Sequence, residues 1–226
     1  KVAILTMNRP QARNALSESL LAELQSQLDR LEDDESIHVV VLRGEGPGFC
    51  AGHDLKEVLA SRSRGYYEWL LTKCTGVMES IKALPQPVIA AVHGFATAAG
   101  AQLAATCDMV IAADDARFAT PGVNIGTWCS TPIVAVSRSM HQKAAMEMLL
   151  TGDLYDAASA QRFGLVNKVV PLASLMDEAM ALADKIASKS RLVVSLGKEA
   201  FYRQSEMERA EAYRYTAGVM THNMLK

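Results

Sequence analysis

The stretch PVIAAVHGFATAAGAQLAATCDMVIAADDARF, residues 87–118, decides the fold of this chain. Residues 88–92 form a continuous apolar run, which is typical of a β-strand buried on both faces. The run stops at residues 93–97, HGFAT, which predicts a turn. From Ala98 the spacing becomes helical, and residues 109–113 form a second buried strand. The stretch therefore predicts a strand–turn–helix–strand unit of an α/β protein.

The turn into the predicted helix is made of small residues, Ala98-Ala99-Gly100. The first N–H groups of a helix have no intrahelical partner and carry partial positive charge. Because the side chains are small, a ligand oxygen could approach these N–H groups closely, above all one that gains charge during a reaction. The alternative is that the small residues only let the helix pack tightly on a sheet.

Working outward, the chain alternates strands and helices up to Pro171 and is only helical beyond it. Ser17 is an expected N-cap, because apolar residues follow it at helical spacing. The further strands are expected at residues 2–7, 39–42 and 166–170. The further helices are expected at residues 64–83, 134–140, 142–150, 157–163, 172–188 and 192–220.

Composition narrows the function classes. The chain has 226 residues, enough for one large domain or one domain with an appendage. A net charge of −2 predicts no nucleic-acid binding, and no apolar run reaches membrane-spanning length. The four cysteines lie far apart with no C-x-x-C pair, so we expect reduced thiols and neither a metal site nor a disulfide framework.

Several nucleotide and hydrolase motifs are excluded. Residues 44–48, GEGPG, follow a strand, but Phe49 stands where a dinucleotide-binding fingerprint has its third glycine. The sequence contains no Walker motif, no H-E-x-x-H and no G-x-S-x-G elbow.

A second small-residue turn follows the strand at residues 39–42, in the segment GFCAGHDL at residues 48–55. Two such turns, each after a buried strand and each before a helix, could supply two converging N–H donors. With NRP at residues 8–10, RNAL at 13–16, LTGD at 150–153 and GLV at 164–166, the whole chain resembles the crotonase superfamily, the enoyl-CoA hydratase/isomerase family.

The resemblance implies a fold and an assembly. The expected fold is α/β, a ClpP-like spiral of β-β-α turns, with residues 1–170 as a core that holds an acyl-CoA site. Residues 171–226 are expected to form a helical region that builds a homotrimer or a dimer of trimers. The resemblance also implies a mitochondrial location and a link to fatty-acid and lipid metabolism.

The resemblance further implies an oxyanion hole for an acyl-CoA thioester, with coenzyme A as part of a ligand and no permanently bound cofactor. The positions that hold the thioester oxygen through their backbone N–H groups are His53 and Ala99. Many relatives have glycine at the second position, and alanine is tolerated there if its φ is negative, as at a helix start.

Contacts to coenzyme A carry over by position. Arg13 and Lys56 match residues that often meet CoA phosphates, and a cationic side chain suits a phosphate. Ala51 and Asp54 of the second turn are assigned to the same ligand. The alternative for the two cations is that they are ordinary surface residues, and Asp54 also fits a structural role as a partner of backbone N–H groups.

The chain departs from the family's hydratases at both catalytic glutamates. Gln102 stands at the first position and Gly122 at the second. Hydration needs one group to take a proton from water while another delivers one to the α-carbon, and an amide cannot take that proton near neutral pH. Residues 127–131, TWCST, offer no replacement carboxylate, and Cys129 is either a nucleophile or an inert thiol.

Two hypotheses follow. The first is an acyl-CoA-binding protein that has lost hydratase chemistry, a pseudoenzyme that acts through binding or as a regulatory subunit. The second is an enzyme that uses the intact hole for another acyl-CoA reaction (isomerisation, thioester hydrolysis or weak hydration) with a water positioned by Gln102.

Overall fold

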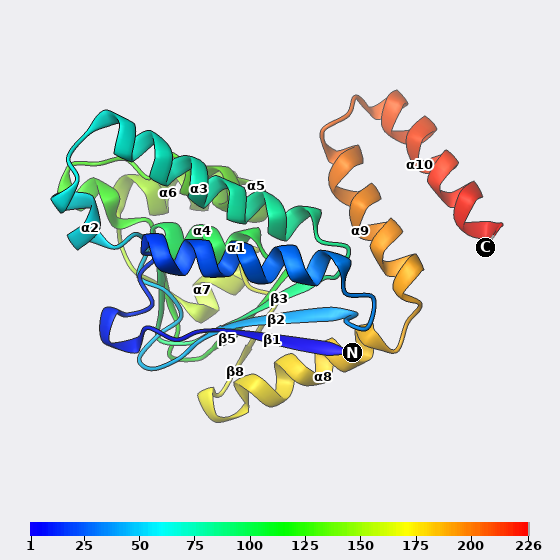
Figure 1. Ribbon diagram of the computed structural model, residues 1–226, viewed down its shortest axis with the longest axis horizontal. Coiled ribbons are helices and arrows are strands. Elements are labelled where there is room, and N and C mark those ends of the chain that lie inside the picture. Colours follow the sequence, from blue (N-terminus) through cyan, green and yellow to red (C-terminus); the bar gives the residue numbers. More distant parts are fainter. Residues whose placement is uncertain (226) are drawn as a thin grey trace.

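A parallel sheet with helices on both faces forms the body of the molecule in the computed structural model, which describes residues 1–225 (Figure 1). The strands are β1 Val2–Met7, β2 Val39–Gly44, β3 Val88–Val92, β4 Phe95–Thr97, β5 Met109–Ala113, β6 Arg117–Ala119, β7 Tyr155–Asp156 and β8 Lys168–Val170. The α-helices are α1 Glu18–Asp33, α2 Leu55–Ala60, α3 Arg64–Ala83, α4 Ala99–Thr106, α5 Pro132–Ser139, α6 Gln142–Thr151, α7 Ala157–Arg162, α8 Leu175–Ala187, α9 Arg191–Ser205 and α10 Arg209–Met224. Short 3₁₀ turns span Pro10–Ala12, Pro121–Ile125 and Leu172–Ser174.

The main sheet has the order β1-β2-β3-β5-β8, and all its strands are parallel. Its central strands β2, β3 and β5 are buried on both faces, as their continuous apolar runs predict, whereas the edge strands β1 and β8 are partly exposed. Alternate residues face opposite sides, so Val40 and Leu42 join one core while Val39 and Val41 join the other. The first core is covered by α1, α3 and α4, and the second by α8.

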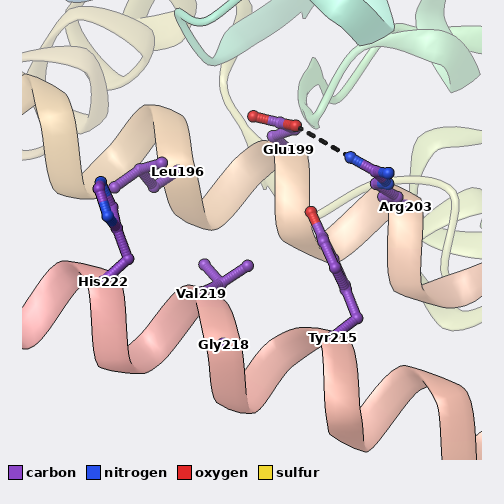
Figure 2. Close-up of a pocket in the computed structure, with 7 residues that line it drawn as sticks. All are labelled: Leu196, Glu199, Arg203, Tyr215, Gly218, Val219 and His222. Carbon is purple, nitrogen blue, oxygen red and sulfur yellow. Dashed lines mark ion pairs between the residues drawn. The ribbon is translucent and has the colours of Figure 1, made fainter.

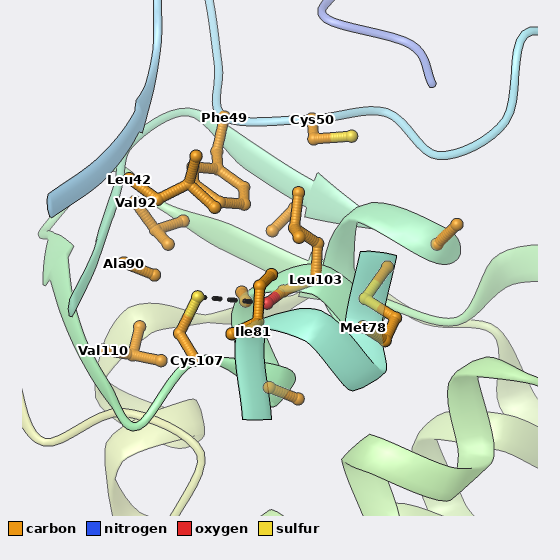
Figure 3. Close-up of a cluster of buried hydrophobic side chains, with 14 of the residues drawn as sticks. Leu42, Phe49, Cys50, Met78, Ile81, Ala90, Val92, Leu103, Cys107 and Val110 are labelled. Atoms are coloured by element: carbon orange, nitrogen blue, oxygen red, sulfur yellow. Dashed lines mark hydrogen bonds between the residues drawn. The ribbon is translucent and has the colours of Figure 1, made fainter. Parts of the chain in front are cut away.

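The larger core lies between the sheet and helices α3 and α4 (Figure 3). Phe49 follows β2 and is fully buried there, beside sheet residues such as Val92. Leu103 fills the space under α4, and the Cys107 thiol donates to its carbonyl over 3.3 Å. This packing fixes the start of α4 over the end of the central strands.

A second, three-stranded sheet has the order β4-β6-β7. Residues 95–97 were expected in a turn, but they form β4 and pair in parallel with β6. The difference has a local reason, because only three residues lie between two bends and carry no period-two pattern long enough to indicate a strand. This small sheet lies directly before α4 in sequence and orients its first turn.

The C-terminal region behaves as two parts. Helix α8 packs on the main sheet through Leu175, Ala179 and Ala183, so it belongs to the core in packing although it lies beyond the boundary expected at residue 170. Helices α9 and α10 stand away from the sheet, and α10 packs on α9 (Figure 1). The single helix expected at residues 192–220 is therefore two helices.

Helix α9 is attached to the body by a buried ion pair. The Nζ atom of Lys198 lies 2.9 Å from Oδ2 of Asp108 and donates to the carbonyls of Ile81 and Gln86. The Tyr202 hydroxyl donates to the other Asp108 oxygen over 2.6 Å. Burial lowers the pKa of Lys198, and the Asp108 carboxylate opposes that shift. Asp108 is thus the anchor of the C-terminal helices.

Among residues 1–225, no helix combines the length and apolar character needed to cross a bilayer. The four cysteines are free and buried. Within the same residues, no group of three or more His, Cys, Asp or Glu side chains is placed to hold a metal ion.

Candidate functional site

The two small-residue turns meet in the structure. Cys50 forms a parallel bridge with Ala96, in which the Cys50 N–H donates to Phe95 O over 3.1 Å. The Thr97 N–H donates to Cys50 O over 3.0 Å, and the Thr97 hydroxyl donates to Ala51 O. The segment at residues 48–55 therefore lies beside β4, the strand that leads into α4.

The N–H groups of His53 and Ala99 are both left free by this pairing. His53 forms a parallel bridge with Leu16, in which Leu16 N donates to Gly52 O (2.7 Å) and Asp54 N donates to Leu16 O (3.3 Å). In such a bridge the middle residue turns its own N–H to the opposite side. Ala99 is the first residue of α4, where no intrahelical acceptor exists. Within residues 1–225, neither N–H donates to another backbone group.

Gly52 sets the distance between the two turns. A Cβ on this residue would lie 3.0 Å from Thr97 O and 3.3 Å from Ala99 N. Its φ of +98° is also a conformation that favours glycine. Glycine thus leaves open the space in front of the Ala99 N–H and lets the next residue, His53, present its N–H from the other turn. The predicted pair of backbone donors is brought together, although its role as an oxyanion hole stays a prediction.

Backbone strain is stored immediately before this helix start. Ala98 has φ 51° and ψ −118°, a conformation that costs a residue with a side chain about 1–3 kcal/mol. It is held there because its N–H donates to Ala119 O and its carbonyl accepts from Gln102 N. Ala99 itself lies in the helix with a negative φ, the condition under which alanine is tolerated at this position. The sequence shows the small residue at 98 but not its strain.

The side chain of His53 does not point to solvent. Both ring nitrogens are inaccessible to water, and neither has a hydrogen-bond partner. Burial lowers the pKa of the imidazole, so the ring is neutral at neutral pH. The Leu16 backbone opposes this shift, without reaching hydrogen-bond geometry to either nitrogen.

Gln102 and Gly122 occupy very different surroundings. Gln102 is only 5% exposed, and its Oε1 atom is buried without a partner. Gly122 is buried in the turn before α5, and a Cβ there would lie 2.7 Å from Thr127 O and 2.9 Å from Cys129 Sγ. The second expected position therefore lacks a side chain and also lacks the space for one. Burial raises the pKa of the Cys129 thiol, which disfavours a thiolate nucleophile.

The residues expected at coenzyme A lie around the rim of the second turn. Arg13 and Lys56 are exposed, and the Arg13 carbonyl accepts from Ala51 N over 3.1 Å. Asp54 caps α2 by accepting from Lys56 N over 3.1 Å, and its other oxygen pairs with Arg9 over 3.2 Å. These contacts give the Asp54 carboxylate a structural role. Contacts of all four residues with coenzyme A remain predictions.

One supporting residue escaped sequence reasoning. Asn14 is fully buried, and its Nδ2 donates to Glu45 O (2.8 Å) and Gly48 O (2.9 Å). These two hydrogen bonds hold the loop after β2, which leads into the segment at residues 48–55. The sequence marks Asn14 only by its place in the segment RNAL. Its hydrogen-bond partners lie 31 and 34 residues away in the chain, so the segment does not indicate them.

A separate groove of about 360 Å³ lies between α9 and α10 (Figure 2). Its walls include Leu196 and Val219, with the Glu199–Arg203 ion pair at one end. Arg203 also stacks over the Tyr215 ring at 4.9 Å. None of the residues expected at the acyl-CoA site lines this groove.

Comparison with known proteins identifies the family. The family model described as enoyl-CoA hydratase/isomerase matches residues 1–226. Enoyl-CoA hydratase domain-containing protein 3, mitochondrial, from Homo sapiens is 46% identical over 220 residues, which cover 97% of this chain and 73% of that protein.

Comparison with solved structures gives the same family. A crystal structure of an enoyl-CoA hydratase from Mycobacterium smegmatis is 52% identical, with a TM-score of 0.98 over 100% of this chain and 88% of that one. The crystal structure of human enoyl-CoA hydratase domain-containing protein 3 is 45% identical, with a TM-score of 0.96 over 100% of this chain and 89% of that one. The predicted α/β fold with a helical C-terminal region is thereby confirmed. This chain belongs to the enoyl-CoA hydratase/isomerase family, within the crotonase superfamily.

Proposed function

We propose that this protein binds acyl-CoA thioesters and is not an efficient enoyl-CoA hydratase. The observation that carries the proposal is the pair of free N–H groups of His53 and Ala99, which lie on the two turns that meet at Gly52. Two backbone N–H groups that donate to one carbonyl oxygen stabilise it, and the stabilisation increases as the oxygen gains negative charge. Because backbone groups make the hole, it does not depend on the side chains that happen to flank it.

The proposed site lacks the side chains that transfer protons during hydration. Gln102 cannot act as a general base, and the space at Gly122 is closed by Thr127 and Cys129. A positioned acid or base typically contributes about 10²- to 10⁴-fold in rate. Without either group, we infer that hydration by the usual route is slower by several orders of magnitude than in enzymes that have both.

A second candidate is catalysis of another acyl-CoA reaction. The buried, unpartnered Oε1 atom of Gln102 favours it, because this oxygen can accept a hydrogen bond from a water molecule or a substrate. Isomerisation, thioester hydrolysis and weak hydration all use a held carbonyl, so each is compatible with the proposed hole.

Location and assembly are also proposals. Relatives whose names describe them as mitochondrial support a mitochondrial location and a role in fatty-acid or lipid metabolism. Helices α9 and α10 carry exposed apolar side chains, among them Phe201 (63%) and Met220 (65%). Exposed apolar residues on helices that stand away from the core support a homotrimer or a dimer of trimers. Light scattering coupled to gel filtration distinguishes both from a monomer.

Calorimetric titration with CoA and with butyryl-CoA tests the binding proposal. We expect both to bind and the thioester to bind more tightly, because only the thioester offers a carbonyl to the two N–H groups. Assays of crotonyl-CoA hydration, isomerisation and thioester hydrolysis then separate the two candidates. The absence of affinity for every CoA compound would overturn the binding proposal, and crotonyl-CoA turnover at ordinary hydratase rates would overturn the reasoning on Gln102 and Gly122.

A further inference from the structure

A second lysine lies beside the buried ion pair that anchors α9. Lys82 is in the last turn of α3, and its Nζ atom lies 4.0 Å from the centre of the Tyr202 ring. The Tyr202 hydroxyl donates to Asp108, the carboxylate that pairs with Lys198. Two ammonium groups and one carboxylate therefore share this cluster, and none of its residues belongs to the proposed acyl-CoA site.

The Asp108 carboxylate is already committed to other donors. Its Oδ1 atom accepts from the Tyr202 hydroxyl over 2.6 Å, and its Oδ2 atom accepts from Val88 N over 2.7 Å and lies 2.9 Å from the Lys198 Nζ atom. Lys198 also donates to two backbone carbonyls, each over 2.9 Å. All three N–H bonds of its ammonium group thus have acceptors, which keeps Lys198 in its charged form.

Lys82 has no such set of acceptors. It takes part in none of the ion pairs found among residues 1–225. Burial is the main cause of a lowered pKa at Lys82, and the Lys198 cation acts in the same direction. Asp108 is the largest influence that opposes this shift, and Cys107 and Glu79 also oppose it. The lowered pKa increases the fraction of Lys82 that is a neutral amine.

Burial beside another cation is the environment that makes a lysine nucleophilic. Only the neutral amine attacks a carbonyl carbon, and desolvation or a neighbouring cation raises its share. The Tyr202 ring attracts the ammonium form, but it also removes water from one side of Lys82. Lys82 is half-buried, so a reagent from solution can reach it, whereas Lys198 is buried. Of the two lysines, Lys82 is the one available for reaction.

We propose that Lys82 is a modification site, which acyl-CoA thioesters acylate at Nζ without a second enzyme. The neutral amine attacks the thioester carbonyl carbon, a C–N bond forms and the C–S bond breaks. Coenzyme A leaves as its thiol and takes the proton that the nitrogen loses. The product is an uncharged amide against the Tyr202 ring of α9. The acyl donor belongs to the ligand class of the proposed function, but the reaction needs no thioester bound between the two turns.

Peptide mass spectrometry of the purified full chain after incubation with butyryl-CoA tests the inference. Lys73 is the matched control, because it is exposed on the same helix. A pKa lower by one unit leaves about tenfold more neutral amine, and lower basicity cancels part of that gain, so we expect Lys82 to react at least about threefold faster than Lys73 near neutral pH. The rate at Lys82 should also level off at a lower pH than the rate at Lys73, which steric access alone would not change.

Two variants connect the reactivity to the cluster. Lys82→Arg keeps a cation over the Tyr202 ring and should remove the fast-reacting site. Tyr202→Phe keeps the ring and leaves Oδ1 of Asp108 free to attract the Lys82 ammonium group. We expect Tyr202→Phe to slow acylation of Lys82 by about twofold or more and to leave Lys73 unchanged.

The outcomes separate this inference from the proposed function. If Lys82 in the wild type reacts no faster than Lys73, the inference fails while the acyl-CoA site stands. If Tyr202→Phe leaves the rate at Lys82 unchanged, the cluster does not activate the amine and the inference also fails. Failure of the proposed function would appear instead as the absence of CoA affinity in calorimetric titration, with Lys82 still acylated.

Discussion

Replacing Gly52 with alanine places a methyl group where the two turns meet. The new carbon would lie 3.0 Å from Thr97 O and 3.3 Å from Ala99 N. A carbonyl oxygen must come within about 3 Å of the same nitrogen to accept its hydrogen bond, so the methyl group and the ligand compete for one space. The φ of +98° adds about 1–3 kcal/mol of strain, and we expect the free energy of unfolding to fall by that amount.

The effect on binding should distinguish thioesters from coenzyme A. Loss of a hydrogen bond to a neutral amide weakens binding by about 0.5–1.5 kcal/mol, and steric exclusion of the carbonyl adds to this. We therefore expect Gly52→Ala to weaken butyryl-CoA binding about tenfold or more and CoA binding by less than about twofold. Calorimetric titration measures both affinities, and urea unfolding measures stability. Gly65→Ala is the control, because a Cβ at Gly65 meets nothing within 4 Å.

A folded Gly52→Ala variant that keeps the wild-type ratio of butyryl-CoA to CoA affinity would refute the placement of the carbonyl at Ala99 N. If the single variant is too unstable to assay, Ala98→Gly can be added. It removes the methyl carbon that lies 3.0 Å from the new Cβ and relieves the strain at residue 98, while the methyl group at residue 52 still covers the Ala99 N–H.

Three further predictions concern stability. Lys198→Met should lower the free energy of unfolding by about 3–5 kcal/mol in urea titration, because it leaves Asp108 charged and buried without its partner. Lys168→Met, which breaks an exposed ion pair, should cost less than about 1 kcal/mol, and equal losses in the two variants would contradict the anchoring role. Gly122→Ala should lower the midpoint of urea unfolding by the equivalent of about 1–3 kcal/mol because its Cβ meets a backbone oxygen at 2.7 Å, and an unchanged midpoint would show that the loop yields. The folded-state pKa of His53 lies below the ordinary 6.5, so the unfolded chain binds more protons at low pH. Wild-type stability relative to His53→Leu should therefore be constant above about pH 7 and fall as the pH drops through 6.5, as urea titrations of both proteins at several pH values will show.

The elements that sequence reasoning located well are those with a strong local signal. The strands β3 and β5 and helix α3 have the expected bounds, because continuous apolar runs and a helical period set them. The cap of α1 was also predicted, and Ser17 Oγ accepts from Leu20 N over 3.2 Å. For these elements the local pattern and the tertiary environment favour the same structure.

Features that depend on distant partners could not be predicted in this way. The break between α9 and α10 at residues 206–208, EME, has no glycine or proline to mark it. The anchor of α9 joins Lys198 to Asp108, which are 90 positions apart in the chain. The closed space at Gly122 depends on the fold of its own loop back onto Thr127. Spacing identifies which residue stands at a position, whereas the room around that position is a property of the packed molecule.

The difference between the two halves of the candidate site follows from how each half is built. The proposed donors to the thioester carbonyl are the main-chain N–H groups of His53 and Ala99, and their positions are set by the pairing of β4 with residues 48–55 and by the absence of a side chain at Gly52. Substitution of neighbouring side chains leaves such donors in place as long as the backbone keeps its path. Proton transfer depends on particular side chains, so under the proposed function Gln102 and Gly122 are enough to account for its loss. The strained backbone at Ala98 and the unpaired Oε1 atom of Gln102 both cost folding free energy, and both lie at the start of α4. A fold that keeps these costs together at the helix start is better explained by a bound carbonyl and its acyl chain than by helix packing, because packing alone requires small residues but no unpaired polar groups.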